Sequence, residues 1–167
     1  ESSAEFYLGY NDETLKIYPY KFGLYANYTL EGNALKVTYT AENKDDKPMY
    51  FFLGGHPAFR CPVGDDESFT DYYVEFEKNE SIARNENDVI LDNANKVAVT
   101  RELFKNDVFM KDKPNSSKIS LVSRKSGRAV TVSYDNSGCI AVWSPYDERG
   151  HFVCLEPWAS APVYCCD

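Results

Sequence analysis

Two ionisable residues occupy similar surroundings in this sequence, and together they could carry out acid–base chemistry. His56 lies between a Gly-Gly pair and a proline, just after the apolar run 49–53. Glu156 ends the apolar run 152–155 and is also followed by a proline. A carboxyl at the end of a buried run is costly to desolvate unless it is paired or used. Burial raises the pKa of a carboxyl and makes it a better base near neutral pH, where a histidine can act as the acid.

The backbone around His56 is expected to hold its side chain in one place. Residues 49–53 predict a buried strand, which Gly54-Gly55 would end with a flexible turn. Pro57 fixes its own φ angle and pushes His56 toward an extended conformation. On these residues alone, a structural histidine that caps the turn is an open alternative. The second site around Glu156 favours an acid and a base that face a common pocket.

The size and charge of the chain narrow the class of protein. Its 167 residues are enough for a single domain with a real core, over 1–167. A net charge of −8 disfavours nucleic acids and anionic membrane surfaces as partners. No apolar run approaches the roughly 20 residues that span a bilayer, and no leader-peptide pattern opens the chain. We therefore expect no nucleic-acid and no membrane partner.

The cysteines indicate a reducing compartment. An odd count without regular spacing is typical of reduced thiols in a cytoplasmic protein, and the five are Cys61, Cys139, Cys154, Cys165 and Cys166. None forms a C-x-x-C pair, so a cysteine-rich zinc site is not expected. The chain is therefore predicted to be cytoplasmic.

Strands are the elements expected to position these residues. Tyr, Phe, Val and Thr favour strands, and aromatic residues make up 15% of the chain. Residues 79–95 are polar and rich in turn formers, and 100–105 suit one helical turn. No long helical pattern is present, so the fold class is all-β and antiparallel, a sandwich or a barrel. The chain predicts successive strands at 5–10, 14–18, 27–30, 34–41, 71–77, 118–123, 128–134, 139–143 and 152–158, the last of them as a short apolar run.

Two hairpins are expected among these strands. The clearer one joins 27–30 to 34–41 through the turn Glu31-Gly32-Asn33. Its second strand alternates apolar and polar residues, which predicts one buried face made by Leu35, Val37, Tyr39 and Ala41. The other hairpin joins 118–123 to 128–134.

Several motifs together carry a resemblance to a known family. The chain is similar to bacterial aldose 1-epimerases, of the galactose mutarotase-like family. The matching motifs fall in the family's order and cover nearly the whole chain, and the His-Pro and Leu-Glu-Pro-Trp motifs together are specific. The motifs are Tyr18-Pro19-Tyr20-Lys21-Phe22, Gly54-Gly55-His56-Pro57-Ala58-Phe59, Phe104-Lys105-Asn106-Asp107, Ala141-Val142-Trp143-Ser144 and Cys154-Leu155-Glu156-Pro157-Trp158.

The resemblance implies a fold, a reaction and a set of site residues. The fold is a large antiparallel β-sandwich, the galactose mutarotase-like supersandwich, with a sugar cleft on one face. The reaction interconverts the α and β anomers of a free hexose, with no metal and no organic cofactor. In the family's pattern His56 is the general acid, Glu156 is the general base and Asp107 binds sugar hydroxyls. Phe59 and Trp158 are candidates to stack on the sugar, with core packing as the alternative for both.

The chain departs from the family in length. Family members are longer, and the match begins well inside their sequence, after a second catalytic histidine and a sugar-binding arginine. The resemblance therefore predicts a central fragment with an incomplete sandwich and unpaired sheet edges. His151 is the only other histidine, and its place does not match the family's second one.

Ring opening needs these residue types. A base must take the proton of the anomeric hydroxyl while an acid protonates the ring oxygen, and the roles then reverse. The two side-chain tips are expected to lie about one sugar ring apart. Two other functions stay open: a non-catalytic sugar-binding domain, and a glycosidase that would use Glu156 and Asp107 about 5–10 Å apart. The preferred sugar and the oligomeric state are not predicted.

Overall fold

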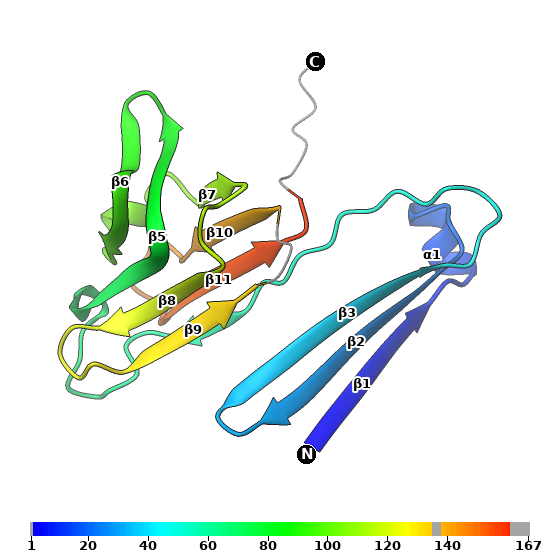
Figure 1. Cartoon of the computed structure of the whole chain (residues 1–167), viewed down its shortest axis with the longest axis horizontal. Helices are drawn as coiled ribbons and strands as arrows, with labels where there is room; N and C mark the ends of the chain where they lie inside the picture. Colours follow the sequence, from blue (N-terminus) through cyan, green and yellow to red (C-terminus); the bar gives the residue numbers. More distant parts are fainter. Residues whose placement is uncertain (1, 135–137, 161–167) are drawn as a thin grey trace. The chain divides into compact units, whose positions relative to one another are not determined.

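Antiparallel strands make up most of the structure, as the alternating segments of the sequence predicted (Figure 1). The computed structural model describes residues 2–134 and 138–160. It divides into two units, residues 1–51 and residues 52–167. The all-β, antiparallel fold class is thereby confirmed, and a single domain over 1–167 remains a prediction.

The first unit holds a three-stranded antiparallel sheet in the order β1-β2-β3. Its strands are β1 (Ser2–Gly9), β2 (Phe22–Glu31) and β3 (Ala34–Asn43). The expected first hairpin is confirmed, because β2 pairs with β3 up to Glu31–Ala34. Gly32 in its turn takes a positive φ of 63°, a backbone conformation that glycine adopts without steric cost.

The buried face predicted for residues 34–41 is wrong. Every residue of β3 is exposed, including Leu35 and Tyr39. Alternation buries one face of a strand only where a second layer packs on it. The described residues of this unit form a single sheet, and its only other element is one short helix.

A helix stands where a strand was expected at residues 14–18. α1 (Asp12–Ile17) begins after Asn11, whose side chain accepts hydrogen bonds from the backbone N–H groups of Glu13 and Thr14, both at 2.9 Å. The Thr14 hydroxyl accepts a bond from the Asn11 N–H at 2.8 Å, which completes a capping box. These caps outweigh the β propensity of a short segment. Within the described residues, no helix is long and apolar enough to cross a membrane.

The second unit is a sandwich of two four-stranded antiparallel sheets. The first sheet has the order β4-β11-β10-β7, made by β4 (Ala58–Arg60), β11 (Phe152–Trp158), β10 (Cys139–Trp143) and β7 (Phe109–Asp112). The second has the order β6-β5-β8-β9, made by β6 (Asp88–Ala98), β5 (Tyr72–Asn85), β8 (Lys118–Ser123) and β9 (Ala129–Ser133). Two 3-10 turns, η1 (Phe69–Asp71) and η2 (Glu102–Phe104), connect strands.

The core lies between these two sheets. It determines which face of β11 is available for functional side chains. Val153 and Leu155 are fully buried and belong to the same apolar cluster as Phe76 and Leu121 of the other sheet. Fully burying one such side chain stabilises the fold by roughly 1.5–3 kcal/mol. Because side chains alternate along a strand, Glu156 projects from the opposite face.

Two further expectations about strands need correction. Residues 49–53 form no strand, and Phe52 is 66% exposed. The backbone from Leu53 to Pro57 runs beside β11 with only scattered hydrogen bonds, and Pro57 has no N–H to add to them. Residues 79–95, expected as polar loop, lie mostly in the long β5–β6 hairpin. Polar residues suit its exposed positions, while Ile82 and Leu91 face the core.

The second expected hairpin and the helical turn are confirmed. β8 pairs with β9 through a turn in which Gly127 has a φ of 72°. η2 lies inside the segment 100–105. Of the five cysteines, Cys61, Cys139 and Cys154 are free and buried, as expected for reduced thiols, whereas Cys165 and Cys166 lie outside the described residues. The cytoplasmic location stays a prediction.

Candidate active site

β11 presents Glu156 on the face that points away from the core. The residue is 2% exposed, and it pairs with Ala141 of β10, so a small neighbour leaves space beside the carboxyl. One of its oxygens, Oε1, is buried and accepts no hydrogen bond within the described structure. A buried carboxylate oxygen without a donor is costly, and such atoms are rare unless a site uses them.

His56 reaches this carboxyl from a neighbouring segment. Its Nε2 lies 3.4 Å from Oε1 of Glu156, and the imidazole is 61% exposed. Backbone hydrogen bonds hold the His56 segment on β11: Gly55 N–H donates to the Pro157 carbonyl at 2.8 Å, and Leu155 N–H donates to the Pro57 carbonyl at 3.3 Å. The expectation that the tips lie one sugar ring apart is therefore wrong, because the two groups are close neighbours.

The electrostatic surroundings of Glu156 suit a proton acceptor. Burial raises the pKa of its carboxyl above the ordinary value of 4.5, and the negative charge of Asp107 raises it further. His56 and the Trp158 side chain act in the opposite direction and lower that pKa. The group is thus a stronger base than an exposed glutamate.

Asp107 joins the site through a tryptophan. The residue precedes β7 and is exposed, and its Oδ1 accepts a hydrogen bond from the indole Nε1–H of Trp143 at 2.7 Å. The Trp143 ring lies edge-on to His56, with ring centroids 6.1 Å apart and planes at 77°. Trp143 thus touches both groups. It lay within a matching motif, but nothing in its sequence surroundings predicted this role.

The two aromatic residues predicted to stack on the sugar have different positions. Trp158 follows Glu156 by two residues and lies on the same face of β11. Phe59 pairs with Val153, and it packs against the apolar core. This packing favours the core-packing alternative for Phe59, and its place beside the sugar stays a prediction. His151 is exposed in the loop before β11.

Three potential metal ligands lie together at this site. One ligand atom each of His56, Cys154 and Glu156 lies within 4.8 Å of the others. Nitrogen, sulfur and carboxylate oxygen together are a donor set that zinc accepts. Burial and the neighbouring Glu156 raise the pKa of the Cys154 thiol to about 12, however, and a thiol binds zinc as the thiolate. The residues alone do not demand a metal, and its expected absence stays a prediction.

Gly54 provides a test of how tightly the segment packs on β11. A Cβ added there would lie 2.4 Å from Cδ1 of Trp158, too close to be accommodated without movement of the indole. We expect Gly54→Ala to lower the free energy of unfolding by about 1–3 kcal/mol through overpacking. Thermal denaturation of the variant measures this loss.

The neighbouring glycine supplies the matched control. A Cβ at Gly55 would meet its nearest atom, Cδ of Pro57, at 3.6 Å, which is an ordinary contact. Gly55→Ala should therefore melt close to the unaltered chain. Equal melting temperatures for the two variants would show that Trp158 does not pack on Gly54 as the structure describes.

Comparisons with known proteins agree on one family. The family profile of aldose 1-epimerases matches residues 1–167. Protein LacX of Lactococcus lactis subsp. lactis, in its chromosomal form, is 31% identical over 172 residues, which cover 95% of this chain and 57% of LacX. The chain thus spans a little over half the length of this curated relative.

Solved structures show the same relationship. A galactose mutarotase related enzyme from Lactobacillus acidophilus superposes with a TM-score of 0.87 at 30% identity, over 99% of this chain and 58% of that one. A galactose mutarotase-like protein from Lactobacillus casei gives 0.80 at 26% identity, over 96% of this chain and 60% of that one. The fold, the order of the motifs and the profile over all 167 residues lead to one conclusion: the chain belongs to the aldose 1-epimerase family.

Proposed function

We propose that this chain is the acid–base part of an aldose 1-epimerase, which interconverts the α and β anomers of a free hexose. The observation that carries the proposal is the pair made by His56 and Glu156. An exposed imidazole stands 3.4 Å from a buried carboxylate oxygen that accepts no hydrogen bond in the described structure. Family membership supports an isomerase, and the relatives named as mutarotase-like support a sugar as the small-molecule ligand.

The close spacing of the two groups suits the reaction. The anomeric hydroxyl and the ring oxygen of a hexose are bonded to the same carbon, C1, so one carboxyl and one imidazole side by side can reach both. Glu156 as carboxylate takes the proton of the C1 hydroxyl, and a C1=O bond forms as the bond from C1 to the ring oxygen breaks. The ring oxygen takes its proton from the His56 imidazolium.

Closure reverses each proton transfer. Rotation about the bond from C1 to C2 turns the other face of the aldehyde toward the hydroxyl that was the ring oxygen. That hydroxyl attacks C1 and gives its proton back to His56, and the carbonyl oxygen receives its proton from Glu156. The two residues end in their starting states, so no oxidant, reductant or second substrate is consumed.

Polarimetry tests the proposal directly. Freshly dissolved α-D-glucose or α-D-galactose should reach anomeric equilibrium faster with the 167-residue chain than in buffer alone, in the presence of EDTA. A nitrophenyl glycoside serves as the control, and its hydrolysis would replace the proposal with a glycosidase. A folded chain that binds the sugar without accelerating the change in rotation would be a non-catalytic sugar-binding domain.

Asp107 is proposed to bind a sugar hydroxyl rather than to carry a proton. Asp107→Asn keeps the shape of the side chain but removes its charge, and hydrogen bonds to charged groups contribute roughly 1.5–3 kcal/mol. We expect KM to rise at least about 10-fold while turnover at saturation changes little. Steady-state polarimetry measures both constants.

Asp92→Asn is the matched control, because Asp92 is exposed on β6 in the other sheet. It should leave both constants unchanged. A collapse of turnover with an unchanged KM in Asp107→Asn would instead assign acid–base work to Asp107.

A further inference from the structure

Arg84 makes the most extensive set of side-chain hydrogen bonds to the segment that carries Asp107. The residue lies near the end of β5, on the second sheet, and its side chain is 13% exposed. Nε donates to the Val108 carbonyl at 3.0 Å, and Nη2 donates to the carbonyls of Asp107 at 2.9 Å and Leu103 at 2.5 Å. One guanidinium thus binds the backbone on both sides of the turn before β7.

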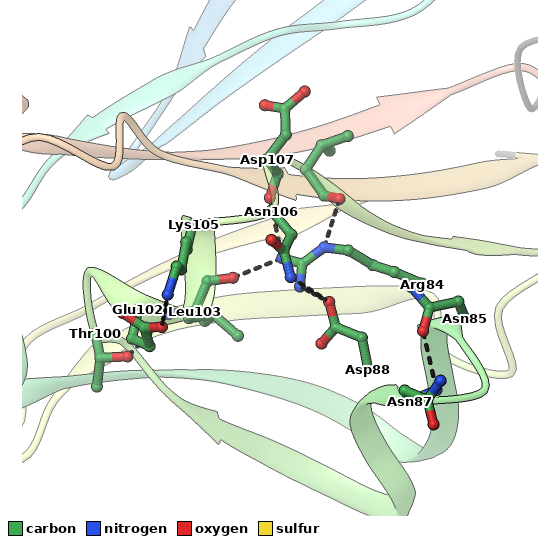
Figure 2. A network of polar contacts seen from close by, with 11 residues as sticks. Arg84, Asn85, Asn87, Asp88, Thr100, Glu102, Leu103, Lys105, Asn106 and Asp107 are labelled. Atoms are coloured by element: carbon green, nitrogen blue, oxygen red, sulfur yellow. Dashed lines mark hydrogen bonds and ion pairs between the residues drawn. The ribbon is translucent and has the colours of Figure 1, made fainter.

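A carboxylate fixes this guanidinium in place. Asp88 Oδ2 accepts hydrogen bonds from Nη1 of Arg84 at 2.9 Å and from Nδ2 of Asn106 at 3.0 Å. These two donors lower the pKa of Asp88, so the carboxylate keeps its charge. Figure 2 shows the Asp88 carboxylate in contact with both the Arg84 guanidinium and the Asn106 side chain, so it links the guanidinium to the turn.

The turn needs such support because its backbone is strained. Asp107 has a φ of 68°, in the left-handed region that residues other than glycine adopt uncommonly, aspartate more often than most. Such residues persist where surrounding contacts hold them, and they cluster at functional sites. The contacts to the carbonyls of residues 103, 107 and 108 supply that restraint from outside the turn.

The strained turn aims the Asp107 carboxyl at the candidate active site. Figure 2 shows this carboxyl pointing away from the guanidinium, which holds the backbone carbonyl of the same residue. On the far side, Oδ1 accepts the bond from Trp143 Nε1–H at 2.7 Å. A side chain of the second sheet thus binds the backbone of the residue whose negative charge acts on Glu156 of the first.

We propose that Arg84, held by Asp88, is a positioning residue that sets the place of the Asp107 carboxyl in the sugar site. This inference rests on the proposed function for the role of Asp107. Arg84 touches no substrate, since it acts through the backbone of the turn. Loss of the guanidinium releases the turn toward ordinary φ values, and the carboxyl then leaves the Trp143 indole and the sugar hydroxyl it would bind.

The first readout does not depend on activity. The chain has two tryptophans, so its indole N–H groups give two resonances in a proton–nitrogen correlation spectrum, and Trp143→Phe identifies one of them. In Arg84→Met the Trp143 resonance should move toward that of a free indole and exchange faster with water. Arg124→Met is the control, because Arg124 is exposed in the turn that follows β8 and its guanidinium lies over the Tyr73 ring, away from the Asp107 turn. It should leave the Trp143 resonance unchanged.

The second readout is a double-mutant cycle in sugar affinity. Arg84→Met should raise KM about 10-fold, the effect of losing one charged hydrogen bond, with kcat within about 2-fold of its starting value. In a chain that already carries Asp107→Asn, the Arg84→Met substitution should raise KM little further, because the two residues act as one unit. If Arg84→Met melts below the assay temperature, Asp88→Asn makes the same test, since it loosens the guanidinium without removing it.

The outcomes separate this inference from the proposed function. An unchanged Trp143 resonance in Arg84→Met, or independent effects on KM in the cycle, would overturn the role of Arg84. If Asp107→Asn itself leaves sugar affinity unchanged, the proposed role of Asp107 fails. The Trp143 resonance then still decides whether Arg84 holds the turn.

Discussion

Replacement of Glu156 by Gln is expected to slow anomer interconversion roughly 100-fold or more, the usual scale for a general acid–base group. Gln keeps the size of the side chain but cannot take the proton of the C1 hydroxyl. His56→Asn should cause a loss of similar size, because it removes the proton donor. The double variant should be little slower than either single one, since the residues act as a unit. Stopped-flow polarimetry with a fresh α-anomer measures all three.

Matched controls exist for both residues. Glu80 is 1% exposed on the other sheet, so Glu80→Gln removes an equally buried carboxyl outside the site. His151→Asn removes the only other histidine. Both controls should retain turnover at temperatures where they are folded. Retention of full activity by Glu156→Gln would exclude this carboxyl as the base and would leave the mutarotase proposal without its central residue.

The pH dependence provides a second signature of the same base. The pKa of Glu156 is raised above the ordinary value of 4.5, chiefly by burial. Since the base must be ionised, kcat/KM should rise with pH through this raised pKa, on the alkaline side of an exposed glutamate. The residual activity of Glu156→Gln should lack that limb of the profile.

The sequence predicted those parts of the structure whose cause lies in a local pattern. The hairpins around Gly32 and Gly127 follow from alternation and from turn residues. The strands β10 and β11 follow from short apolar runs. α1 was missed because its capping box decides between two weak propensities over a few residues. Residues 79–95 were missed because a polar hairpin lacks the apolar alternation that indicates a strand.

The sequence predicted the residues of the candidate site that lie in recognisable motifs, but not the contacts between them. Two apolar runs that end in ionisable residues brought His56 and Glu156 to attention, and the structure makes them neighbours. The choice between sugar stacking and core packing for Phe59 could not be made from the motif, because a motif does not say which face of the strand a ring takes. Trp143 and Arg84 could not be predicted, because their contacts to the Asp107 turn join segments that lie far apart in the chain.

The ionised carboxylate of Glu156 should also lower the free energy of unfolding, and this effect can be measured without a substrate. The folded pKa of Glu156 is raised, so between the ordinary pKa and the folded one the folded chain binds more protons than the unfolded chain. The contribution of Glu156 to the free energy of unfolding is therefore fully present below the ordinary pKa of 4.5, and it is lost as pH rises through the folded pKa. As pH rises through the folded pKa, the carboxyl takes on a charge in a place where it has lost most of its hydration.

Glu156→Gln should accordingly melt a few degrees higher than the unaltered chain at pH 8, because it removes a buried charge. At pH 4 the two should melt together, since the native carboxyl is then protonated and neutral like the amide. Other carboxyls change stability with pH in the opposite direction; Glu67 is one, because its hydrogen bonds lower its pKa to about 2. Their effect is the same in both chains, so the difference in melting temperature at each pH reports on Glu156 alone. A Glu156→Gln variant that melts lower at pH 8 would show that the ionised carboxyl is well satisfied in the fold. The raised pKa would then fail as the reason why this residue acts as the base.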